Sequence, residues 1–479
     1  MKLRTVVHRR FGDGDGGDGK GHRFVYAQPS AAILAIDAGA ASLLDAFAGE
    51  GREAQDGLAL AACDDGEATL RELVELGLIR PAGEARVPAA DLPPMPFPLA
   101  TLVLNVTNKC NLSCTYCYEY GEDKLGPGRA SKAPPRMSDE TARQSIDFLF
   151  ENAGERPQVA ITFFGGETLL NVPAILAAVE HANARGKEHN KRVHFALTTN
   201  ATLLEPDVVE LLVAHRFGIT VSIDGDRSQQ DRHRVFKSGK GSFDVIAPRI
   251  RYLVDRNKAA RGRPIGARVT LTRDATSVLD TFRYLTQELG FDEVGFAPVT
   301  ADPSRDYALP GAAYDQMLAE FSALAEEHVS AALRDEACGF ANLNDLLREL
   351  HHGVNKAHPC GAGLGLLGVS TAGDLGLCHR FAESESHGVG DVVNGIDEAA
   401  RTAFLRAGHV DNKTDCNTCF ARPLCAGGCY HEAHVRFGEA TRPNLHACEW
   451  IRGWTDIGLS AYARIAAGNP RFFLRFESA

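Results

Sequence analysis

Three cysteines in one short run are the residues of this chain whose types and spacing could do the most specific chemistry. Cys110, Cys114 and Cys117 follow the pattern Cys-x3-Cys-x2-Cys. A closed structural zinc site takes four ligands, and electron-transfer iron–sulfur clusters are usually held by four cysteines. A 4Fe–4S cluster held by three cysteines keeps one iron open to bind another molecule. The alternative is a metal loop whose fourth ligand lies elsewhere among the 12 cysteines of the chain.

An alternation of apolar runs and amphipathic segments surrounds this loop. The expected strands are Leu102–Val106, Val159–Phe164, Val193–Thr199, Gly218–Ile223, Ile265–Leu271 and Glu293–Ala297. The expected helices are Ser138–Asn152, Val172–His189, Pro206–His215, Phe243–Asn257 and Ala275–Leu289. This order predicts an α/β fold with a parallel sheet and right-handed crossovers. Ligands of such folds gather at the carboxyl ends of the strands.

Polar or glycine-rich residues follow several of these strands. The second strand ends in Gly165, Gly166 and Glu167, where glycines admit a close ligand and a carboxylate can hold an ammonium group. The other candidates at strand ends are Asn200, Ser222, Asp224 and, within the fifth strand, Arg268. Each pattern alone is typical of a turn or a helix cap. Arg268 taken by itself would be expected to form an ion pair at the surface. Their order along successive strands favours one ligand site.

The region from about residue 100 to 300 resembles the radical S-adenosylmethionine superfamily. The resemblance implies a partial barrel of six β/α units, with a 4Fe–4S cluster on the three cysteines. It also implies S-adenosylmethionine on the open iron, with Gly165, Gly166 and Glu167 at its amino group and Tyr116 at adenine. The implied contacts of the ribose and carboxylate are Asn200, Ser222, Asp224 and Arg268.

Seven further cysteines gather in the last 120 residues. They are Cys360, Cys378, Cys416, Cys419, Cys425, Cys429 and Cys448. Disulfides compete with metal binding as an explanation, but the sequence shows no secretory signal, and such clusters in cytosolic proteins usually bind metal. The spacing resembles the SPASM domain, which implies two auxiliary 4Fe–4S clusters.

The resemblance distributes these cysteines between an outer and an inner cluster. The outer one would be held by Cys416, Cys419, Cys425 and Cys448, and the inner one by Cys360, Cys378 and Cys429. The inner cluster is one ligand short, and either Cys338 or a substrate cysteine would complete it. Cys63 is left over and is expected to be an ordinary thiol.

The whole chain divides into five expected parts. Residues 1–87 resemble a small winged-helix-like peptide-binding domain, with a structural cap on the barrel as the alternative. Residues 88–98 form a proline-rich linker, and residues 99–300 form the radical barrel. A helical bridge (301–357) and the SPASM domain (358–479) follow. In the first part, strands are expected near Phe24–Tyr26 and Ala32–Ile36 and helices near Ala40–Phe47 and Ala68–Leu76, with a flexible glycine-rich loop after Phe11.

Composition excludes several classes of function. The net charge of −11 argues against nucleic acid as a general partner. No apolar run reaches the length of a membrane span, and the N-terminus has no secretory apolar region. Free thiolates and iron–sulfur clusters need a reducing compartment, so we expect a cytoplasmic protein.

Motifs along nearly the whole chain resemble the maturation enzymes of quinohemoprotein amine dehydrogenases. They lie at residues 103–123, 358–368, 378–381, 425–434 and 442–454. The resemblance implies thioether crosslinks between Cys sulfur and Asp or Glu methylene carbons of a small cysteine-rich polypeptide, driven by an external one-electron reductant. Two other maturase classes stay open: a formylglycine-forming enzyme, whose family tends to carry Asp where this chain has His379, and a carbon–carbon crosslinking enzyme. An iron–sulfur scaffold would explain neither the open iron nor Gly165–Glu167.

Overall fold

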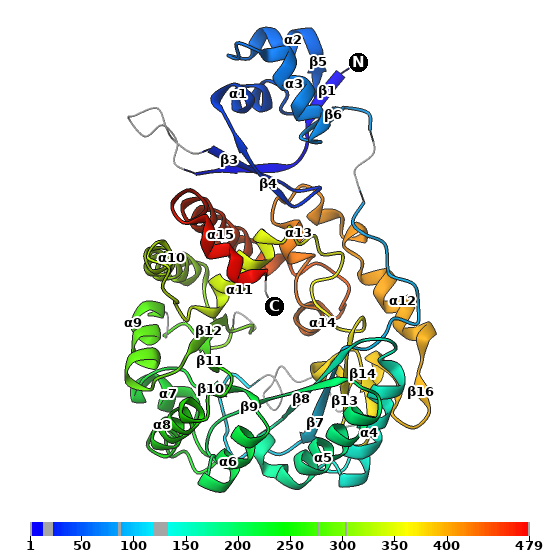
Figure 1. Cartoon of the computed structure of the whole chain (residues 1–479), viewed down its shortest axis with the longest axis vertical. Helices are drawn as coiled ribbons and strands as arrows, with labels where there is room; N and C mark the ends of the chain where they lie inside the picture. Colours follow the sequence, from blue (N-terminus) through cyan, green and yellow to red (C-terminus); the bar gives the residue numbers. More distant parts are fainter. Residues whose placement is uncertain are drawn as a thin grey trace.

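The structure is a computed structural model that describes residues 2–12, 23–84, 88–117, 133–274, 277–301 and 304–477. A large sheet with helices around it forms the body of the molecule, and a small N-terminal unit stands at one end (Figure 1). Within the described ranges, no helix is long and apolar enough to cross a membrane.

Six parallel strands form the centre of the sheet, in the order of the sequence. They are β7 (Thr101–Thr107), β8 (Gln158–Gly165), β9 (Arg192–Thr199), β10 (Gly218–Ser222), β11 (Ile265–Leu271) and β12 (Glu293–Pro298). The predicted α/β class and all six predicted strands are confirmed. Burial alternates along them, as in β11, where Ala267 and Val269 are buried and Arg268 between them is exposed. One face of the sheet therefore packs apolar side chains, and the other carries polar ones.

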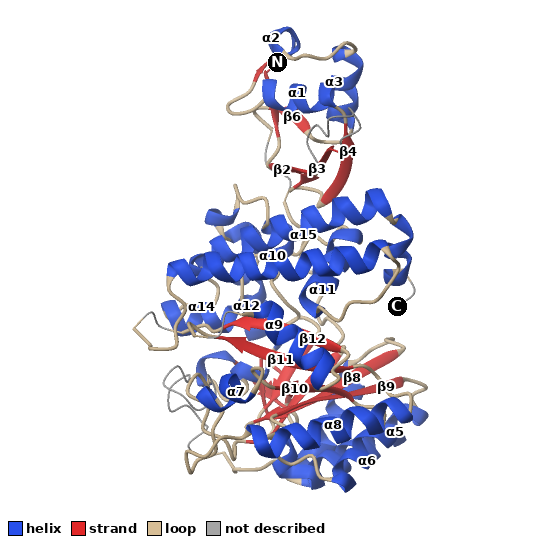
Figure 2. Ribbon diagram, turned by 90° about the vertical axis from the view of Figure 1, so that its left-hand side faces the viewer, coloured by secondary structure: helices blue, strands red, loops and turns tan. Residues whose placement is uncertain are grey.

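Helices cover the apolar face (Figures 1 and 2). They are α4 (Asp139–Asn152), α5 (Val172–Glu188), α6 (Pro206–Ala214), α7 (Arg227–His233), α8 (Phe243–Ala259) and α9 (Val278–Arg283). The last expected helix, 275–289, is shorter than predicted: after α9 the chain continues as a π-helical turn, Tyr284–Glu288, and residues 275–276 lie outside the described residues. Sequence periodicity missed α7, a short polar helix held at its start by a capping box between Asp226 and Gln229.

The C-terminal cysteine region begins as an extension of the barrel sheet. Strand β13 (Leu366–Val369) pairs in parallel with β7. Three antiparallel strands then complete ten: β14 (Asp374–Gly376), β15 (Gly388–Asp391) and β16 (Gly395–Ile396). Helices α12 (Glu398–Gly408), α13 (Arg422–Cys425) and α14 (Tyr430–Phe437) follow. The cysteines after β13 are thereby tied to the edge of the same sheet that carries the cysteine loop after β7.

Helices between the barrel and this region pack against the end of the chain. They are α10 (Gly311–Leu333), α11 (Ala341–His351) and α15 (Cys448–Gly468). The ring of Phe321 on α10 lies 4.9 Å from that of Trp450 and 5.3 Å from that of Trp454, both on α15. These ring contacts fix the first turns of α15, the helix that begins at Cys448.

The N-terminal unit has a core of its own. Strands β1 (Lys2–Thr5), β5 (Arg52–Glu53) and β6 (Ile79–Pro81) form one sheet, and β2 (His8–Phe11), β3 (Arg23–Ala27) and β4 (Ala32–Ile36) form another. Helices α1 (Ala38–Ala46), α2 (Ala54–Leu60) and α3 (Gly66–Glu75) complete it. The strands and helices predicted for this part are confirmed, whereas most of the expected glycine-rich loop, residues 13–22, lies outside the described residues.

This unit is docked on the body through its second sheet. Tyr26 is fully buried and shares an apolar cluster with Leu346 and Leu459. The guanidinium of Arg9 donates to both carboxylate oxygens of Asp456 on α15, at 2.7 and 2.8 Å. The proline-rich segment that follows is also anchored, since the amide of Ala89 donates to Asp411 at 2.9 Å.

Candidate functional site

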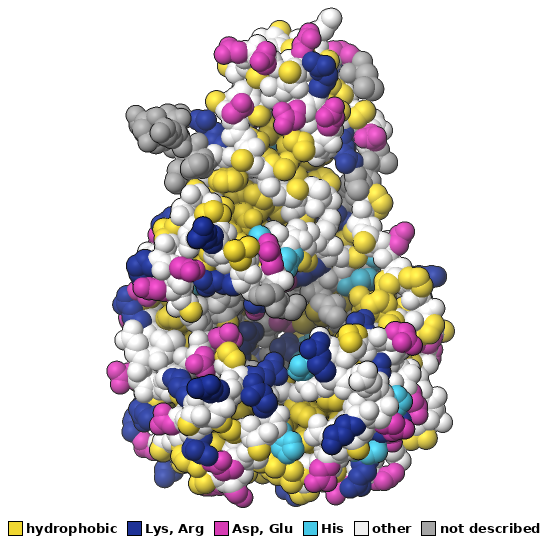
Figure 3. Space-filling model, in the orientation of Figure 1, with side chains coloured by type: hydrophobic (Ala, Val, Ile, Leu, Met, Phe, Trp, Pro, Cys, Tyr) yellow, Lys and Arg dark blue, Asp and Glu magenta, His cyan; other side chains and the backbone are white. Residues whose placement is uncertain are grey.

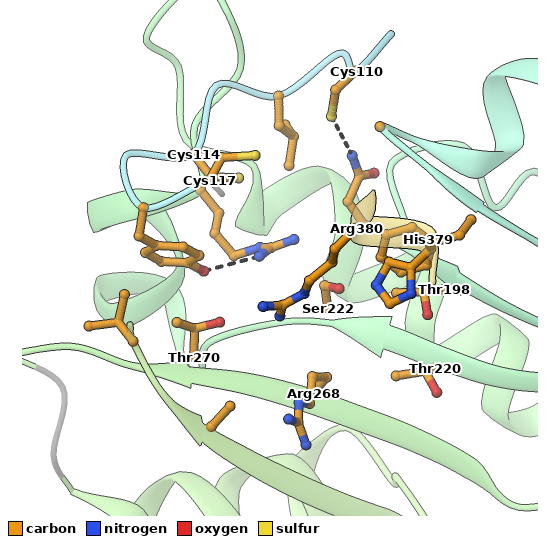
Figure 4. Close-up of a pocket in the computed structure, with 18 of the residues that line it drawn as sticks. Cys110, Cys114, Cys117, Thr198, Thr220, Ser222, Arg268, Thr270, His379 and Arg380 are labelled. Atoms are coloured by element: carbon orange, nitrogen blue, oxygen red, sulfur yellow. Dashed lines mark hydrogen bonds between the residues drawn. The ribbon is translucent and has the colours of Figure 1, made fainter. Parts of the chain in front are cut away.

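The three cysteines of the opening motif lie at the carboxyl end of β7, on a loop tied to the segment after α7. The amide of Ser113 donates to the carbonyl of Val235 at 2.8 Å, and that of Thr115 donates to the carbonyl of His233 at 3.1 Å. Cys110, Cys114 and Cys117 line one cavity of about 460 Å³ at the strand ends (Figure 4). The loop therefore presents all three sulfurs to the position where α/β folds bind ligands.

A 4Fe–4S cluster fits these thiols better than a single metal ion does. Among the residues that the structure describes, no three His, Cys, Asp or Glu side chains converge closely enough to hold one ion. The three cysteines still share the cavity, and their charges interact. Cluster ligands bind different irons, so their sulfurs stand farther apart than the ligands of one ion. Burial raises the pKa of Cys114 to about 11, so metal binding itself must stabilise the thiolate.

Gly165–Glu167 brace the cysteine loop as well as lining the cavity. Gly165 has φ +130°, and a Cβ there would lie 2.4 Å from the carbonyl oxygen of Thr107, at the start of the loop. The amides of Gly166 and Glu167 donate to the carbonyls of Thr107 and Lys109 at 3.0 and 2.9 Å. Only glycine allows this approach of two backbones.

The carboxylate of Glu167 is buried and already holds the end of the next strand. It accepts hydrogen bonds from the Thr199 hydroxyl at 2.6 Å, the Asn200 amide at 2.7 Å and the Leu169 amide at 3.1 Å. A carboxylate has about four acceptor positions, so about one remains for a ligand. Burial raises the pKa of Glu167, and these hydrogen bonds oppose that shift.

Asn200 connects this strand end to the cysteine loop. Its side-chain amide donates to the Asn111 carbonyl oxygen at 3.0 Å and contacts the Cys110 sulfur at 3.8 Å (Figure 4). Ser222 lines the same cavity from β10. The predicted residues Gly165, Gly166, Glu167, Asn200 and Ser222 are thus brought together around one space.

Tyr116 and Asp224 form a buried group with an arginine that the sequence analysis missed. Arg234 donates to the Tyr116 hydroxyl at 3.0 Å, and that hydroxyl donates to the carboxylate of Asp224. The charge of Arg234 also acts on Cys114. Arg234 is 8% exposed, and its Nε is buried without a partner among the described residues. An unpartnered buried N–H beside the cysteines is what a bound carboxylate would satisfy.

Arg268, which was predicted with the S-adenosylmethionine contacts, lines the same cavity. It extends from β11 on the side away from the three cysteines, and Arg380 points into the space between (Figure 4). Arg234, and not Arg268, is the arginine beside the cysteine loop.

A second cavity of about 420 Å³ adjoins the first and is lined by later cysteines, among them Cys416, Cys419, Cys425, Cys429 and Cys448. Arg268, Glu432 and residues 297–300 at the end of β12 line both cavities. The opening cysteine loop and the C-terminal cysteines therefore face one continuous interior region.

The C-terminal cysteines form two electrostatically coupled sets. One contains Cys416, Cys419, Cys425 and Cys448, and the other contains Cys360, Cys378 and Cys429. These are the sets that the resemblance assigns to an outer and an inner cluster, and their ligand roles remain predictions. Burial raises the pKa of Cys416 to about 11 and that of Cys378 to about 12.

Cys338, a proposed fourth ligand of the inner set, lies elsewhere. It precedes Gly339, whose carbonyl accepts from the Val294 amide at 2.8 Å near the amino end of β12. A Cβ on Gly339 would stand 2.2 Å from the Asp292 carbonyl. Cys338 therefore lies at the amino end of β12, away from the cavity at the carboxyl ends of the strands, and lines a different pocket. Cys63 belongs to the core of the N-terminal unit.

Lys413 is buried between the two C-terminal sets. It is 2% exposed, and its ammonium donates to the Ala426 carbonyl at 3.0 Å, in the turn that joins Cys425 to Cys429. Its charge acts on Cys416 and Cys425 of one set and on Cys360 of the other. A buried cation at this position offsets the negative charge that thiolate-bound clusters would bring.

Comparison with known proteins identifies the central part of the chain. Residues 104–265 match the family model of the Radical SAM superfamily. The chain is 33% identical over 165 residues to a serine-type anaerobic sulfatase-maturating enzyme of Bacteroides thetaiotaomicron, a match that covers 33% of this chain and 37% of that enzyme. It is 23% identical over 392 residues to a cysteine-type anaerobic sulfatase-maturating enzyme of Clostridium novyi, covering 77% and 97%.

A solved structure has the same fold. Superposition on anSMEcpe with bound AdoMet gives a TM-score of 0.60 at 18% identity and covers 79% of this chain and 99% of that one. The same protein has been solved with bound AdoMet and a Kp18Cys peptide.

Proposed function

We propose that this enzyme, whose residues 104–265 form a radical SAM domain, makes thioether crosslinks within a small cysteine-rich polypeptide. Each crosslink joins a Cys sulfur to a methylene carbon of Asp or Glu, in the manner of the amine dehydrogenase γ subunit. Relatives named as sulfatase-maturating enzymes, and a similar structure that contains a peptide, support a polypeptide substrate. The sequence motifs at residues 358–368 and 425–434 support the finer assignment.

The crosslink is a two-electron oxidation. When bound, S-adenosylmethionine and its 4Fe–4S cluster supply a 5′-deoxyadenosyl radical, and auxiliary 4Fe–4S clusters supply an acceptor for one electron. One C–H and one S–H bond break, and one C–S bond forms. The hydrogen atom from carbon leaves in 5′-deoxyadenosine, the thiol hydrogen leaves as a proton, and one electron passes to the acceptor. An external reductant provides the electron that begins each turnover.

The residues around the opening cysteines would bind and orient S-adenosylmethionine. Cys110, Cys114 and Cys117 would hold the cluster. The strand-end residues of the cavity would hold the rest of the molecule: Tyr116, Gly165, Gly166, Glu167, Asn200, Ser222, Asp224 and Arg234. We assign the methionyl carboxylate to Arg234 because its buried Nε is unpartnered beside Cys114.

The observation that carries the proposal is the three-cysteine inner set beside the radical cavity. The segment that begins at Cys378 continues into His379 and Arg380, which line the same cavity as the opening cysteines. Cys338 lies near the amino end of β12, away from this cavity, so we assign the fourth position of the inner set to a substrate thiol. A substrate thiol in the missing position would lie close to the place where a hydrogen atom is removed from carbon.

The histidines in this region are poor bases. Burial lowers the pKa of both His379 and His431 to about 3. Both imidazoles are therefore neutral at neutral pH. Their rings fill the wall of the cavity, where His379 packs 4.5 Å from Phe164, so we assign them a packing role.

Formylglycine formation is the second candidate, favoured by the maturase names among the relatives. The position after Cys378, where enzymes of that class tend to have Asp, holds the neutral, buried His379. A neutral imidazole at this position lacks the negative charge of a carboxylate. This difference favours the thioether product.

Anaerobic co-expression with a small cysteine-rich polypeptide, followed by tandem mass spectrometry, tests the proposal. We expect a loss of two hydrogens per crosslink and fragments in which Cys and Asp or Glu stay joined. The Cys114→Ala variant, co-expressed in parallel, serves as the control and should leave the polypeptide unmodified. An aldehyde product, or a carbon–carbon link, would overturn the thioether assignment.

A further inference from the structure

Two arginines besides Arg234 line the cavity of the opening cysteines. Arg268 extends from β11, and Arg380 comes from the turn after Cys378 (Figure 4). Burial lowers the pKa of Arg268, and the positive charge of Arg380 lowers it further. The mechanism above gives neither of them a task.

The site of Arg268 is built to keep its guanidinium accessible within the protein. Its neighbours across the sheet are Ser222 on β10 and Gly295 on β12. A Cβ on Gly295 would lie 3.3 Å from Arg268 Nη1, so glycine leaves the room that the guanidinium fills. The side chain is exposed although both neighbours along the strand, Ala267 and Val269, are buried, because it faces the cavity. Figure 3 shows the hollow in the body of the molecule, with Lys and Arg side chains gathered along its lower rim.

Arg268 makes no side-chain hydrogen bond and no ion pair with any residue in the described ranges. Asp345 is the acidic group whose charge reaches it, but that carboxylate is exposed and accepts a hydrogen bond from Arg348 at 2.8 Å. Arg380 pairs with Glu432 at 3.8 Å. The guanidinium of Arg268 is therefore a positive charge at the cavity that a bound anion would stabilise.

We propose that Arg268 and Arg380 bind the carboxylate of the Asp or Glu residue that is crosslinked, an inference that rests on the proposed function. A guanidinium donates two parallel hydrogen bonds to a carboxylate, which fixes the orientation of the acid as well as its position. Arg268 lines both cavities, and Arg380 is two residues from Cys378 of the inner set. An acid held there lies in the cavity that the opening cysteines also line.

The shared chemistry is a carboxylate, which a polypeptide offers either on a side chain or at its C-terminus. The experiment uses the reconstituted holoenzyme under anaerobic conditions and synthetic peptides derived from the polypeptide that the wild type crosslinks. One peptide keeps the target Glu, one has Gln in its place, and a third keeps Glu but ends in an amide. The measurements are crosslink yield by mass spectrometry and the rate of peptide-dependent 5′-deoxyadenosine formation.

The decisive variant is Arg268→Gln, with Arg263→Gln as the matched control. Arg263 precedes the same strand, about 16 Å from Arg268 at the rise of an extended chain, and donates to the Phe195 carbonyl at 3.4 Å. We expect the wild type to prefer the Glu peptide over the Gln peptide by about 10- to 100-fold, the effect of a charge-assisted hydrogen-bond pair. Arg268→Gln should lose most of that preference, and Arg263→Gln should keep it.

Three results would overturn the inference. The first is that Arg268→Gln keeps the preference for the Glu peptide. The second is that its affinity for S-adenosylmethionine falls as much as its crosslinking does, which would make Arg268 a contact of the cofactor. The third is that the C-terminal amide abolishes the reaction while the Glu-to-Gln change does not. A wild-type enzyme that forms a product other than a thioether contradicts the proposed function instead. The Glu preference can then still be measured from 5′-deoxyadenosine formation.

Discussion

The two cysteine-bearing regions of the molecule are built in different ways. Cys110, Cys114 and Cys117 come from one loop after β7, and buried charged residues such as Arg234 and Glu167 line the space beside them. The later cysteines come from separate turns and helix starts spread over 89 residues (360–448). Between two of them, Ala426, Gly427 and Gly428 reverse the chain, with φ of 47°, 89° and 80°.

Under the proposed function, the first region would admit a small molecule and the later cysteines would hold clusters. A strand end offers free backbone groups and room, so a loop there can leave one position of a cluster open. The set Cys416, Cys419, Cys425 and Cys448 also lines a cavity, of about 420 Å³, but four thiolates would occupy every iron of a 4Fe–4S cluster and leave no position open. The inner set, near Arg380, also has three cysteines, so a cluster there would have one open position, as a cluster on the opening loop would.

The largest contrast is expected from removing one cysteine in each region. Cys114→Ala should lower S-adenosylmethionine cleavage by more than about 1,000-fold, because the cofactors supply the bond-breaking chemistry. Cys425→Ala should keep peptide-independent cleavage within about tenfold of the wild type and lose crosslinking. 5′-Deoxyadenosine and peptide products are quantified by chromatography and mass spectrometry. Equal loss of cleavage in both variants would erase the distinction between the two regions.

Substituting one glycine in each region tests whether the backbone of the opening loop is held more rigidly than that of the later turn. Gly165→Ala places a Cβ 2.4 Å from the Thr107 carbonyl at φ +130°, and should destabilise the protein by about 2–5 kcal/mol. Gly427→Ala meets the flexible side chain of Lys413 at 2.4 Å, and should cost about 1–3 kcal/mol because that side chain can move. Denaturant unfolding of the metal-free proteins measures both. A smaller loss for Gly165→Ala would contradict the rigid bracing of the opening loop.

Replacing Arg234 tests whether this side chain binds the carboxylate of S-adenosylmethionine. Arg234→Gln removes the buried guanidinium beside Cys114 and should weaken S-adenosylmethionine binding by about 10- to 100-fold. Equilibrium dialysis with the reconstituted enzyme gives the dissociation constant. The control is Arg232→Gln, whose exposed side chain bonds the Asp274 carbonyl at 2.9 Å and should leave the affinity unchanged. Unaltered binding by Arg234→Gln would move the carboxylate contact elsewhere.

The smallest expected effect concerns Lys413. Replacing it by Met removes a buried positive charge from between the two C-terminal sets, so the reduction potentials of their clusters should fall by some tens of millivolts. The cluster on the opening cysteines should keep its potential. Redox titration followed by electron paramagnetic resonance separates the signals, and Lys191→Met, just before the amino end of β9, is the control. A shift at all clusters alike would point to a general change of the fold.

The sequence predicted the framework of this molecule better than its interior contacts. Runs such as Ile265–Leu271 are apolar enough, and bounded clearly enough, that the strands could be placed within a residue or two. The grouping of cysteines needed only spacing and resemblance. Arg234 was missed because it lies in a polar stretch, Arg227 to Phe236, that has no apolar periodicity and owes its shape to a capping box and to contacts with the cysteine loop.

Other features depend on tertiary contacts that no local pattern encodes. Strand β13 has four residues and joins the sheet only because β7 offers a free edge. The distance of Cys338 from the inner set follows from its backbone pairing with β12. Alternation along β11 places Arg268 on the polar face, but its proximity to Arg380 arises from a turn more than 100 residues later in the sequence.

The origin of the hydrogen atom that is removed tests the central claim most directly. The reconstituted enzyme is given S-adenosylmethionine, a reductant and a substrate peptide whose target Glu carries deuterium on its side-chain methylenes. We expect deuterium in 5′-deoxyadenosine, and none there when only the cysteine β-carbon is labelled. Transfer from the cysteine β-carbon, with none from Glu, would contradict thioether formation at the acidic residue and favour formylglycine-type chemistry.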